Sequence, residues 1–369
     1  MKLTVLIPTL CQGGAERVAA LLANEWSKTH EVTVVVLHHE IKQTVSPAVR
    51  VESLDVRCSG VFFYSGWSVF HGLARFRRYM ESDRRPDAVL GMLETSNLIL
   101  SLYRRFNPRA PVVLVGGSRI YAKRYPRPYR DLFRCYRQLD ALVVNSRVNR
   151  TLFVQEYGLA PRRVVFVPNA VDVEALRQAA RGETPPLIAR LASRGRVLVA
   201  AGRLVKRKNF AGLIDAFAVI HQSVPDVFLI ILGEGAERGR LERHIAGHGL
   251  SDAVFLPGHA DNPFVWMNAA SGLVLSSVYE GWPNVLVEAM ALGLPVAATD
   301  CPTGPREILE GGRWGRLIAP GNPRELAEAM LDLLKQPRRD YPCVDDWRTE
   351  TIAPRYLNVM QSAIEARHL

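Results

Sequence analysis

Short apolar runs alternate with amphipathic segments along almost the whole chain. Continuous apolar runs bounded by glycine, proline or polar loops are typical of strands buried on both faces of a parallel sheet. Between several of them, apolar residues recur at helical spacing, as in Ala15–Lys28 and Phe210–Gln222. The pattern therefore predicts an α/β protein in which helices join parallel strands. The runs with strand character are Lys2–Pro8, Glu31–His38, Asp87–Met92, Val112–Val115, Ala141–Asn145, Val164–Pro168, Val197–Ala201, Phe228–Leu232, Val254–Leu256, Leu273–Ser277 and Val296–Thr299.

The number of these repeats predicts two doubly wound, Rossmann-like domains. A chain of 369 residues is long enough for two domains of ordinary size. We expect the first domain over residues 1–173 and the second over 196–350. A linker is expected over 174–195 because this stretch contains Arg181-Gly182-Glu183 and Pro185-Pro186, which are typical of loops. Residues 351–369 are expected to be helical, with a break at Pro354.

One predicted strand–loop–helix–strand unit, Gly272–Asp300, carries two carboxylates. Glu280 lies in the loop after the strand, where ligands bind in open α/β sheets, and Glu288 lies on the helix. The residues beside Glu288 are apolar, so its carboxylate needs hydrogen-bond donors, and sugar or ribose hydroxyls are suitable ones. For such a pair alone, a capping glutamate and a salt-bridged glutamate are the simpler interpretation.

The helix of this unit is expected to begin directly after Pro283, which tolerates the first turn because it needs no N–H there. The first amides of a helix lack partners within it. We therefore expect the N–H groups of Asn284, Val285 and Leu286 to be free to bind a phosphate.

Two further turns follow predicted strands and combine glycine with candidate ligand groups. Arg203 and Lys208 flank the turn that begins at Gly202, and two cations there can neutralise a diphosphate, although a basic surface loop is the alternative. Gly13 and Gly14 lie between the first strand and the first helix. This is the position of a substrate-facing turn, although a tight turn without a ligand explains the pair equally well.

The charge of the chain is concentrated in one stretch. The whole chain has a net charge of +11, and residues 73–150 alone contain 17 Lys and Arg against 6 Asp and Glu. Nucleic acid, an anionic membrane or a polyanionic substrate could explain this excess, and a solvated arginine-rich surface is the alternative without a ligand. In Gly60–Met80, aromatic residues interleave with arginines, which suits either a membrane boundary or a core-facing helix with a basic outer face.

Cysteine spacing and hydropathy favour a cytoplasmic protein. The five cysteines show no C-x-x-C spacing, so neither a zinc ribbon nor a disulfide framework is indicated. No signal peptide is expected at the amino terminus, and no apolar run approaches the roughly 20 residues that a membrane span needs.

The motifs together resemble those of the nucleotide-sugar glycosyltransferases of family 4, which have the GT-B fold. The resemblance rests on Glu280-Gly-Trp-Pro-Asn with Glu288 and the GLPV sequence after it, on the GR-x-x-x-x-KN sequence from Gly202, and on Gly13-Gly14-Ala15-Glu16. Asn169-Ala170-Val171-Asp172 is similar to the P-N-G-V-D element that ends the first domain of the family, with Ala170 in place of the usual glycine.

The resemblance implies a role for each of these residues. Arg203, Lys208 and the amides after Pro283 would meet the charge of the diphosphate, which the glycine pair Gly13-Gly14 approaches from the other domain. Glu288 would hold the ribose and Glu280 the donor sugar, and the loop at Gly258 would border the base. The terminal helix would return to the first domain. Ser118 and Arg119 do not match the family's loop, so no role passes to them.

The implied reaction is glycosyl transfer with retention of anomeric configuration, by front-face attack assisted by the leaving phosphate. The expected donor is a nucleotide sugar, in our interpretation a UDP-hexose or UDP-N-acetylhexosamine. No D-x-D motif follows a suitable strand, so neither a metal nor another cofactor is expected.

The acceptor is the open part of this prediction. The basic, aromatic-rich first half favours a peripheral enzyme on the inner leaflet of the plasma membrane, extending a polyprenyl-diphosphate-linked sugar in surface polysaccharide or glycan assembly. A family 4 enzyme with a soluble acceptor is the first alternative. A basic nucleic-acid-binding protein is the second, but it lacks a recognition motif and leaves both glutamates unexplained.

Overall fold

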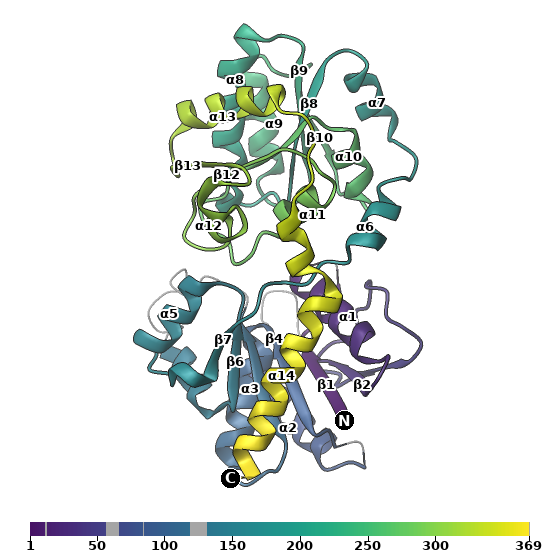
Figure 1. The fold of residues 1–369 in the computed structure, drawn as a ribbon, viewed down its shortest axis with the longest axis vertical. Helices are drawn as coiled ribbons and strands as arrows, with labels where there is room; N and C mark the ends of the chain where they lie inside the picture. The colour runs from purple at the N-terminus through teal and green to yellow at the C-terminus, as the bar shows by residue number, and fades with distance from the viewer. Residues whose placement is uncertain (12, 57–65, 84, 119–130, 369) are drawn as a thin grey trace. The chain divides into compact units, whose positions relative to one another are not determined.

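The computed structural model of this chain describes residues 1–11, 13–56, 66–83, 85–118 and 131–368. It divides into two compact units, each with one sheet and helices packed on it (Figure 1). Unit 1 is Met1–Val171 with Asp346–Leu369, and unit 2 is Asp172–Asp345. Within the described residues, no helix combines the length and apolar character that crossing a membrane requires.

Unit 1 is built on a seven-stranded parallel sheet in the order β3-β2-β1-β4-β5-β6-β7. The central strands are buried along nearly their whole length, which is why they read as continuous apolar runs in the sequence. The chain leaves β1 toward one edge of the sheet and returns at β4 to build the other half. The strands are β1 (Lys2–Ile7), β2 (Glu31–Val36), β3 (Val49–Ser53), β4 (Ala88–Met92), β5 (Val113–Ser118), β6 (Ala141–Val144) and β7 (Val164–Phe166).

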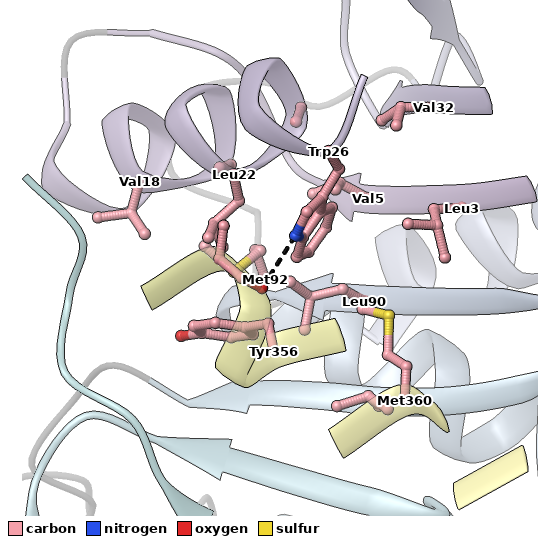
Figure 2. Packing of buried hydrophobic residues seen from close by; sticks show 14 of the residues in the cluster. Leu3, Val5, Val18, Leu22, Trp26, Val32, Leu90, Met92, Tyr356 and Met360 are labelled. Atoms are coloured by element: carbon pink, nitrogen blue, oxygen red, sulfur yellow. Dashed lines mark hydrogen bonds between the residues drawn. The ribbon is translucent and has the colours of Figure 1, made fainter. Parts of the chain in front are cut away.

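Helices cover this sheet, and the carboxy-terminal helix is one of them. Among the described residues, the helices of unit 1 are α1 (Gly14–Trp26), α2 (Gly66–Met80), α3 (Leu93–Phe106), α5 (Arg147–Gln155) and α14 (Thr349–His368), with short 3₁₀ turns η2 (Phe133–Gln138) and η3 (Pro161–Arg163). Figure 2 shows that Trp26 of α1 and Tyr356 of α14 belong to the same buried cluster. Their ring centroids lie 6.3 Å apart in an edge-to-face arrangement. The indole N–H of Trp26 donates to the carbonyl of Ala353 at 3.1 Å.

The helix break expected at Pro354 is wrong, because α14 continues through this residue. A proline in a helix interior costs roughly 3 kcal/mol. The buried face of α14, with Ile352, Ala353, Tyr356 and Met360, offsets this cost by packing into the same core as α1 and the sheet. Tertiary packing therefore outweighs the local preference.

Unit 2 is built on a six-stranded parallel sheet in the order β10-β9-β8-β11-β12-β13. The order reverses between β8 and β11, which are direct neighbours although two strands and their helices separate them in the chain. Its strands are β8 (Arg196–Ala201), β9 (Val227–Leu232), β10 (Val254–Gly258), β11 (Gly272–Leu275), β12 (Val296–Thr299) and β13 (Arg316–Ile318).

The helices of unit 2 include the stretch for which a linker is expected. The helical segments are α6 (Val173–Ala179), α7 (Pro186–Ala192), η4 (Lys206–Lys208), α8 (Phe210–Ser223), α9 (Arg238–Gly247), α10 (Pro263–Ala269), α11 (Asn284–Ala291), α12 (Pro305–Ile308), η5 (Glu310–Gly312) and α13 (Pro323–Lys335), and η6 (Pro342–Trp347) spans the boundary to unit 1.

The predicted linker over 174–195 is wrong, since α6 and α7 occupy most of it. Leu176, Ile188 and Leu191 on these helices are buried, and the side chain of Asn262 donates to the carbonyl of Ala179 at 2.8 Å. Unit 2 therefore begins at Asp172 and ends at Asp345, and the segment from Asp346 onward belongs to unit 1.

Candidate active site

A buried ion pair joins two loops of unit 2. Lys208 ends the 3₁₀ turn η4 after β8, and its Nζ lies 2.6 Å from Glu280 Oε1, in the loop after β11. Ser277 donates its hydroxyl to the same carboxylate oxygen at 2.7 Å, and Arg207 Nη1 lies 3.2 Å from Oε2. We call these four residues the Lys208–Glu280 cluster. It places two cations and one carboxylate in a site where the Glu280 and Lys208 side chains are almost fully buried.

The two cations keep the carboxylate ionised. Burial by itself raises the pKa of Glu280, but the charges of Lys208 and Arg207 and the hydrogen bonds from Lys208 and Ser277 outweigh it, so the pKa lies below its ordinary value. An ionised carboxylate accepts hydrogen bonds and donates none. The cluster therefore offers a permanent acceptor beside two permanent cations.

Backbone and hydroxyl hydrogen bonds fix the positions of the two loops relative to each other. Ser276 donates its hydroxyl to the carbonyl of Lys208 at 2.8 Å, and the amide of Val278 donates to the carbonyl of Arg207, also at 2.8 Å. From the side of β12, Thr303 donates its hydroxyl to the carbonyl of Glu280. The cluster is thus carried by a rigid set of loops at the carboxyl ends of neighbouring strands.

The position of the cluster follows from the strand order. Lys208 follows β8 and Glu280 follows β11, so the two residues meet where the order of the sheet reverses, although 72 positions separate them. In open α/β sheets, ligands bind outside the carboxyl ends of the strands at this switch point.

Glycines let the neighbouring turns come close to the cluster. Gly233 follows β9 with a φ of +136°, and a Cβ on it would lie 2.0 Å from the carbonyl oxygen of Gly202. The amide of Gly233 donates to the carbonyl of Gly258 at 2.8 Å, and Gly258 has a φ of +96°. Only glycine allows this approach and these angles. The loops after β8, β9 and β10 therefore form one continuous edge that contains Gly202 and Gly258.

The two predicted cations of the turn after β8 have different surroundings in the structure. Lys208 enters the cluster, whereas the side chain of Arg203 is exposed and makes no ion pair or side-chain hydrogen bond in the part of the chain that the structure describes. Sequence reasoning missed Arg207, which takes the second contact with Glu280. Arg207 could have been considered because it lies between Lys206 and Lys208. Successive side chains of a 3₁₀ turn point in widely different directions, so any of the three could face the Glu280 loop.

Helix α11 follows the Glu280 loop, and its first turn differs from the prediction in one respect. The amide of Leu286 is not free, because it donates to the carbonyl of Pro283 at 3.0 Å. Asn284 and Val285 begin the helix and are half-buried. Glu288 lies farther along α11 and is buried, as its apolar neighbours predict.

Polar groups also gather at the carboxyl edge of the sheet in unit 1. Gly13 caps α1 after β1, and Gly14 begins the helix. Ser96, Ser118 and Asn145, which lie after or at the end of β4, β5 and β6, are buried, and their side chains have polar atoms without a hydrogen-bond partner among the described residues. Each such unpartnered group costs roughly 1–3 kcal/mol.

Two family models match the chain, one over most of each unit. Residues 12–175 match the model described as "Glycosyltransferase Family 4", and residues 195–336 match the one described as "Glycosyl transferases group 1".

The chain is also similar to a curated protein of Campylobacter jejuni, "N-acetylgalactosamine-N,N'-diacetylbacillosaminyl-diphospho-undecaprenol 4-alpha-N-acetylgalactosaminyltransferase". The two are 27% identical over 340 residues, which cover 90% of each chain.

Solved structures share the fold over nearly the whole chain. The lipopolysaccharide outer core galactosyltransferase WaaB, in its apo form, matches with a TM-score of 0.73 and 17% identity, covering 98% of this chain and 99% of its own. The Anabaena protein Alr3699/HepE in complex with UDP-glucose matches with a TM-score of 0.72 and 18% identity, covering 100% of this chain and 99% of its own. These matches confirm the predicted architecture of two doubly wound domains.

Proposed function

This chain belongs to the glycosyltransferases with the GT-B fold, and we propose that it transfers a hexose or N-acetylhexosamine, with retention, from a UDP-sugar to a polyprenyl-diphosphate-linked glycan. In this proposal the enzyme acts in surface polysaccharide or glycan assembly. The observation that carries it is the buried Lys208–Glu280 ion pair at the switch point of unit 2. The pair supplies both a cation for a departing diphosphate and an acceptor for sugar hydroxyls.

The donor side of the proposal rests on unused hydrogen-bonding capacity. Glu280 accepts three hydrogen bonds, from Lys208, Arg207 and Ser277, whereas a carboxylate has about four acceptor positions. One position is left for a donor-sugar hydroxyl. Lys208 keeps N–H groups beyond the one that contacts Glu280, and these can reach a phosphate. Arg203, exposed at the same turn, is proposed to close on the diphosphate when the donor binds, and Glu288 to hold the ribose.

The same contacts support retention by front-face attack. A carboxylate that is held by two cations and a hydroxyl is a weak nucleophile, because its charge is already neutralised. Glu280 is therefore proposed to orient the sugar, while Lys208 and Arg207 stabilise the diphosphate as negative charge grows on it. Isolation of a glycosyl adduct on Glu280 would contradict this assignment.

The acceptor side draws on unit 1 and on the relatives. The Campylobacter protein is named for a diphospho-undecaprenol-linked acceptor, and the Anabaena structure contains UDP-glucose. We propose the same two substrate classes here. The unpartnered polar atoms of Ser118 and Asn145 are proposed to bind hydroxyls of the acceptor glycan.

A substrate panel tests this function. The purified chain is incubated with UDP- and GDP-linked hexoses and N-acetylhexosamines, each with a polyprenyl-diphosphate-linked disaccharide or with the same disaccharide free. We expect one UDP-sugar to be transferred to the lipid-linked acceptor, with the anomeric configuration kept in the product. If sugar is transferred only to the free disaccharide, the acceptor is soluble and the lipid-linked assignment is wrong. If no donor supports transfer, the proposal is overturned.

Membrane binding is proposed to use the side of unit 1 where the amino-terminal ends of the strands lie. There, Arg104, Arg105, Arg137, Arg163 and Arg367 surround Asp140 in a hollow of about 420 Å³, which we call the arginine hollow. Arg104 is largely used internally, since it donates to Asp140 at 2.7 Å and to the carbonyl of Val112. Arg105 and Arg163 are exposed, and no ion pair within the described residues neutralises them. An anionic headgroup is the proposed partner.

Flotation with liposomes tests the arginine hollow. We expect the chain to float with vesicles of anionic lipid at low salt and to stay unbound with neutral vesicles. The double variant Arg105→Glu/Arg163→Glu should lose most of this binding. The variant Arg181→Glu/Arg190→Glu changes the charge equally on exposed positions of unit 2 and should keep it. Equal losses in both variants would show that net charge, and not the hollow, drives binding.

A further inference from the structure

Two histidines and one aspartate converge on the surface of unit 2. Asp215 lies on α8, His244 lies on α9, and His248 lies directly after α9. Asp215 Oδ1 is 2.6 Å from His244 Nε2 and 3.0 Å from His248 Nε2, and all three atoms lie within 4.8 Å of one another. The two imidazole rings meet edge to face, with their centroids 4.8 Å apart.

These three atoms form a donor set for a divalent transition-metal ion. Imidazole nitrogen and carboxylate oxygen bind Zn²⁺ at about 2.0–2.2 Å, with solvent completing the coordination. Ligand atoms of a tetrahedral site then lie roughly 3.3 Å apart. The distances of 2.6 and 3.0 Å from Asp215 Oδ1 to the two Nε2 atoms would have to widen slightly, and the Nε2 atoms of His244 and His248, which lie within 4.8 Å of each other, would adjust by rotation of the rings. Each imidazole would turn its Nε2 lone pair to the metal and carry its proton on Nδ1.

The scaffold under the three ligands is rigid and open to solvent. His244 and His248 are four residues apart, so they project from the same side of α9. Leu241 and Ile245 hold α9 in the core of unit 2, and Leu213 and Phe217 hold α8 there. The ligand side chains are 34–44% exposed, so an ion could enter without opening the fold. Arg240, one helical turn before His244, is paired with Glu237 at 3.0 Å.

From this geometry we propose that Asp215, His244 and His248 bind a divalent transition-metal ion, with Zn²⁺ as the best match. The ion would fasten α8 to α9, the helices that follow the turns at Gly202 and Gly233. None of the three residues belongs to the Lys208–Glu280 cluster. The site is therefore structural and does not depend on the proposed reaction.

Zn²⁺ binding to the untagged full chain tests this inference. Isothermal titration calorimetry should show one Zn²⁺ ion per chain, and saturating Zn²⁺ should raise the melting temperature by about 5 °C. Co²⁺ should give a visible absorption band without the thiolate band that cysteine ligands would produce. Mg²⁺ and Ca²⁺, which prefer all-oxygen sites, should bind far more weakly.

Variants show whether the ion is held by these residues. Asp215→Asn and His248→Ala each remove one partly exposed ligand and should weaken Zn²⁺ binding by at least about 100-fold. His39→Ala removes an exposed histidine of unit 1 and should leave the affinity unchanged. Unchanged affinity in the two cluster variants, or no Zn²⁺ binding by the wild-type chain, would overturn the proposal and leave the cluster as a hydrogen bond between two helices.

Discussion

Replacing Glu280 with Gln is expected to lower kcat/KM for glycosyl transfer by about a thousandfold or more. The amide keeps the shape of the side chain but removes its charge. It can no longer accept from Lys208, Arg207 and Ser277 while also holding a sugar hydroxyl. The donor sugar would lose its orientation, and the two cations would lose the counter-charge that sets their positions. Steady-state kinetics with the donor found in the substrate panel measures the loss.

The same substitution should destabilise unit 2 in a pH-dependent manner. Leaving buried cations without their partner costs about 3–5 kcal/mol. The pKa of Glu280 is lowered from its ordinary value of 4.5, so the ionised carboxylate stabilises the folded state above that pH. This contribution is lost as the pH falls through the lower, folded-state pKa. The difference in unfolding free energy between wild type and Glu280→Gln should have its largest value at pH 7 and become smaller in acid.

Glu183→Gln is the matched control for this experiment. Glu183 is exposed and lies in unit 2, between α6 and α7. Both transfer and unfolding free energy should stay close to wild type. A Glu280→Gln variant with wild-type kcat/KM would remove Glu280 from the reaction.

Replacing Lys208 with Met is expected to lower kcat by about 100- to 1,000-fold, with a smaller change in KM. The cation should matter most when the bond to the diphosphate breaks, because negative charge on the leaving group is greatest then. Lys206→Met is the control, since Lys206 lies on the same 3₁₀ turn but is exposed. An equal loss in both variants would mean that the turn itself, and not the buried charge, supports transfer.

A double-mutant cycle measures how strongly Lys208 and Glu280 stabilise each other in the folded state. Lys208→Met leaves Glu280 buried with Arg207 as its remaining cation, and Glu280→Gln leaves both cations without a carboxylate. The double variant removes both charges of the closest contact. The double variant should therefore lose less unfolding free energy than the sum of the losses of the two single variants. Strict additivity would show that the pair contributes little coupling energy.

Much of the fold could be predicted from local pattern. Apolar runs bounded by glycine and proline gave most of the strands, because strands buried on both faces need continuous apolar sequence. The edge strand β3 was missed, since Val49–Ser53 alternates with polar residues and is half exposed. Helices α6 and α7 were missed because glycine and proline between them read as a linker, whereas the apolar side chains of both helices pack into unit 2.

The residues of the candidate site were predicted in part. Lys208 and Glu280 were predicted from their turns, and the structure places them 2.6 Å apart. Arg207 was overlooked in favour of Arg203, because spacing in the sequence does not say which side chains of a tight turn point inward. The Asp215–His244–His248 cluster could not be predicted from sequence, since Asp215 lies on a different helix from the two histidines.

The amino-acid sequence by itself determined the alternation of strand and helix, and it placed charged and glycine-rich turns after the strands. Both follow from interactions among near neighbours in the chain. Only the tertiary structure decided that β8 and β11 lie side by side and bring Lys208 to Glu280. The family resemblance predicted the return of the terminal helix to the first domain, and the tertiary structure decided that α14 packs there against Trp26. Strand order and helix docking depend on how distant apolar faces are buried together, and no local pattern encodes that choice.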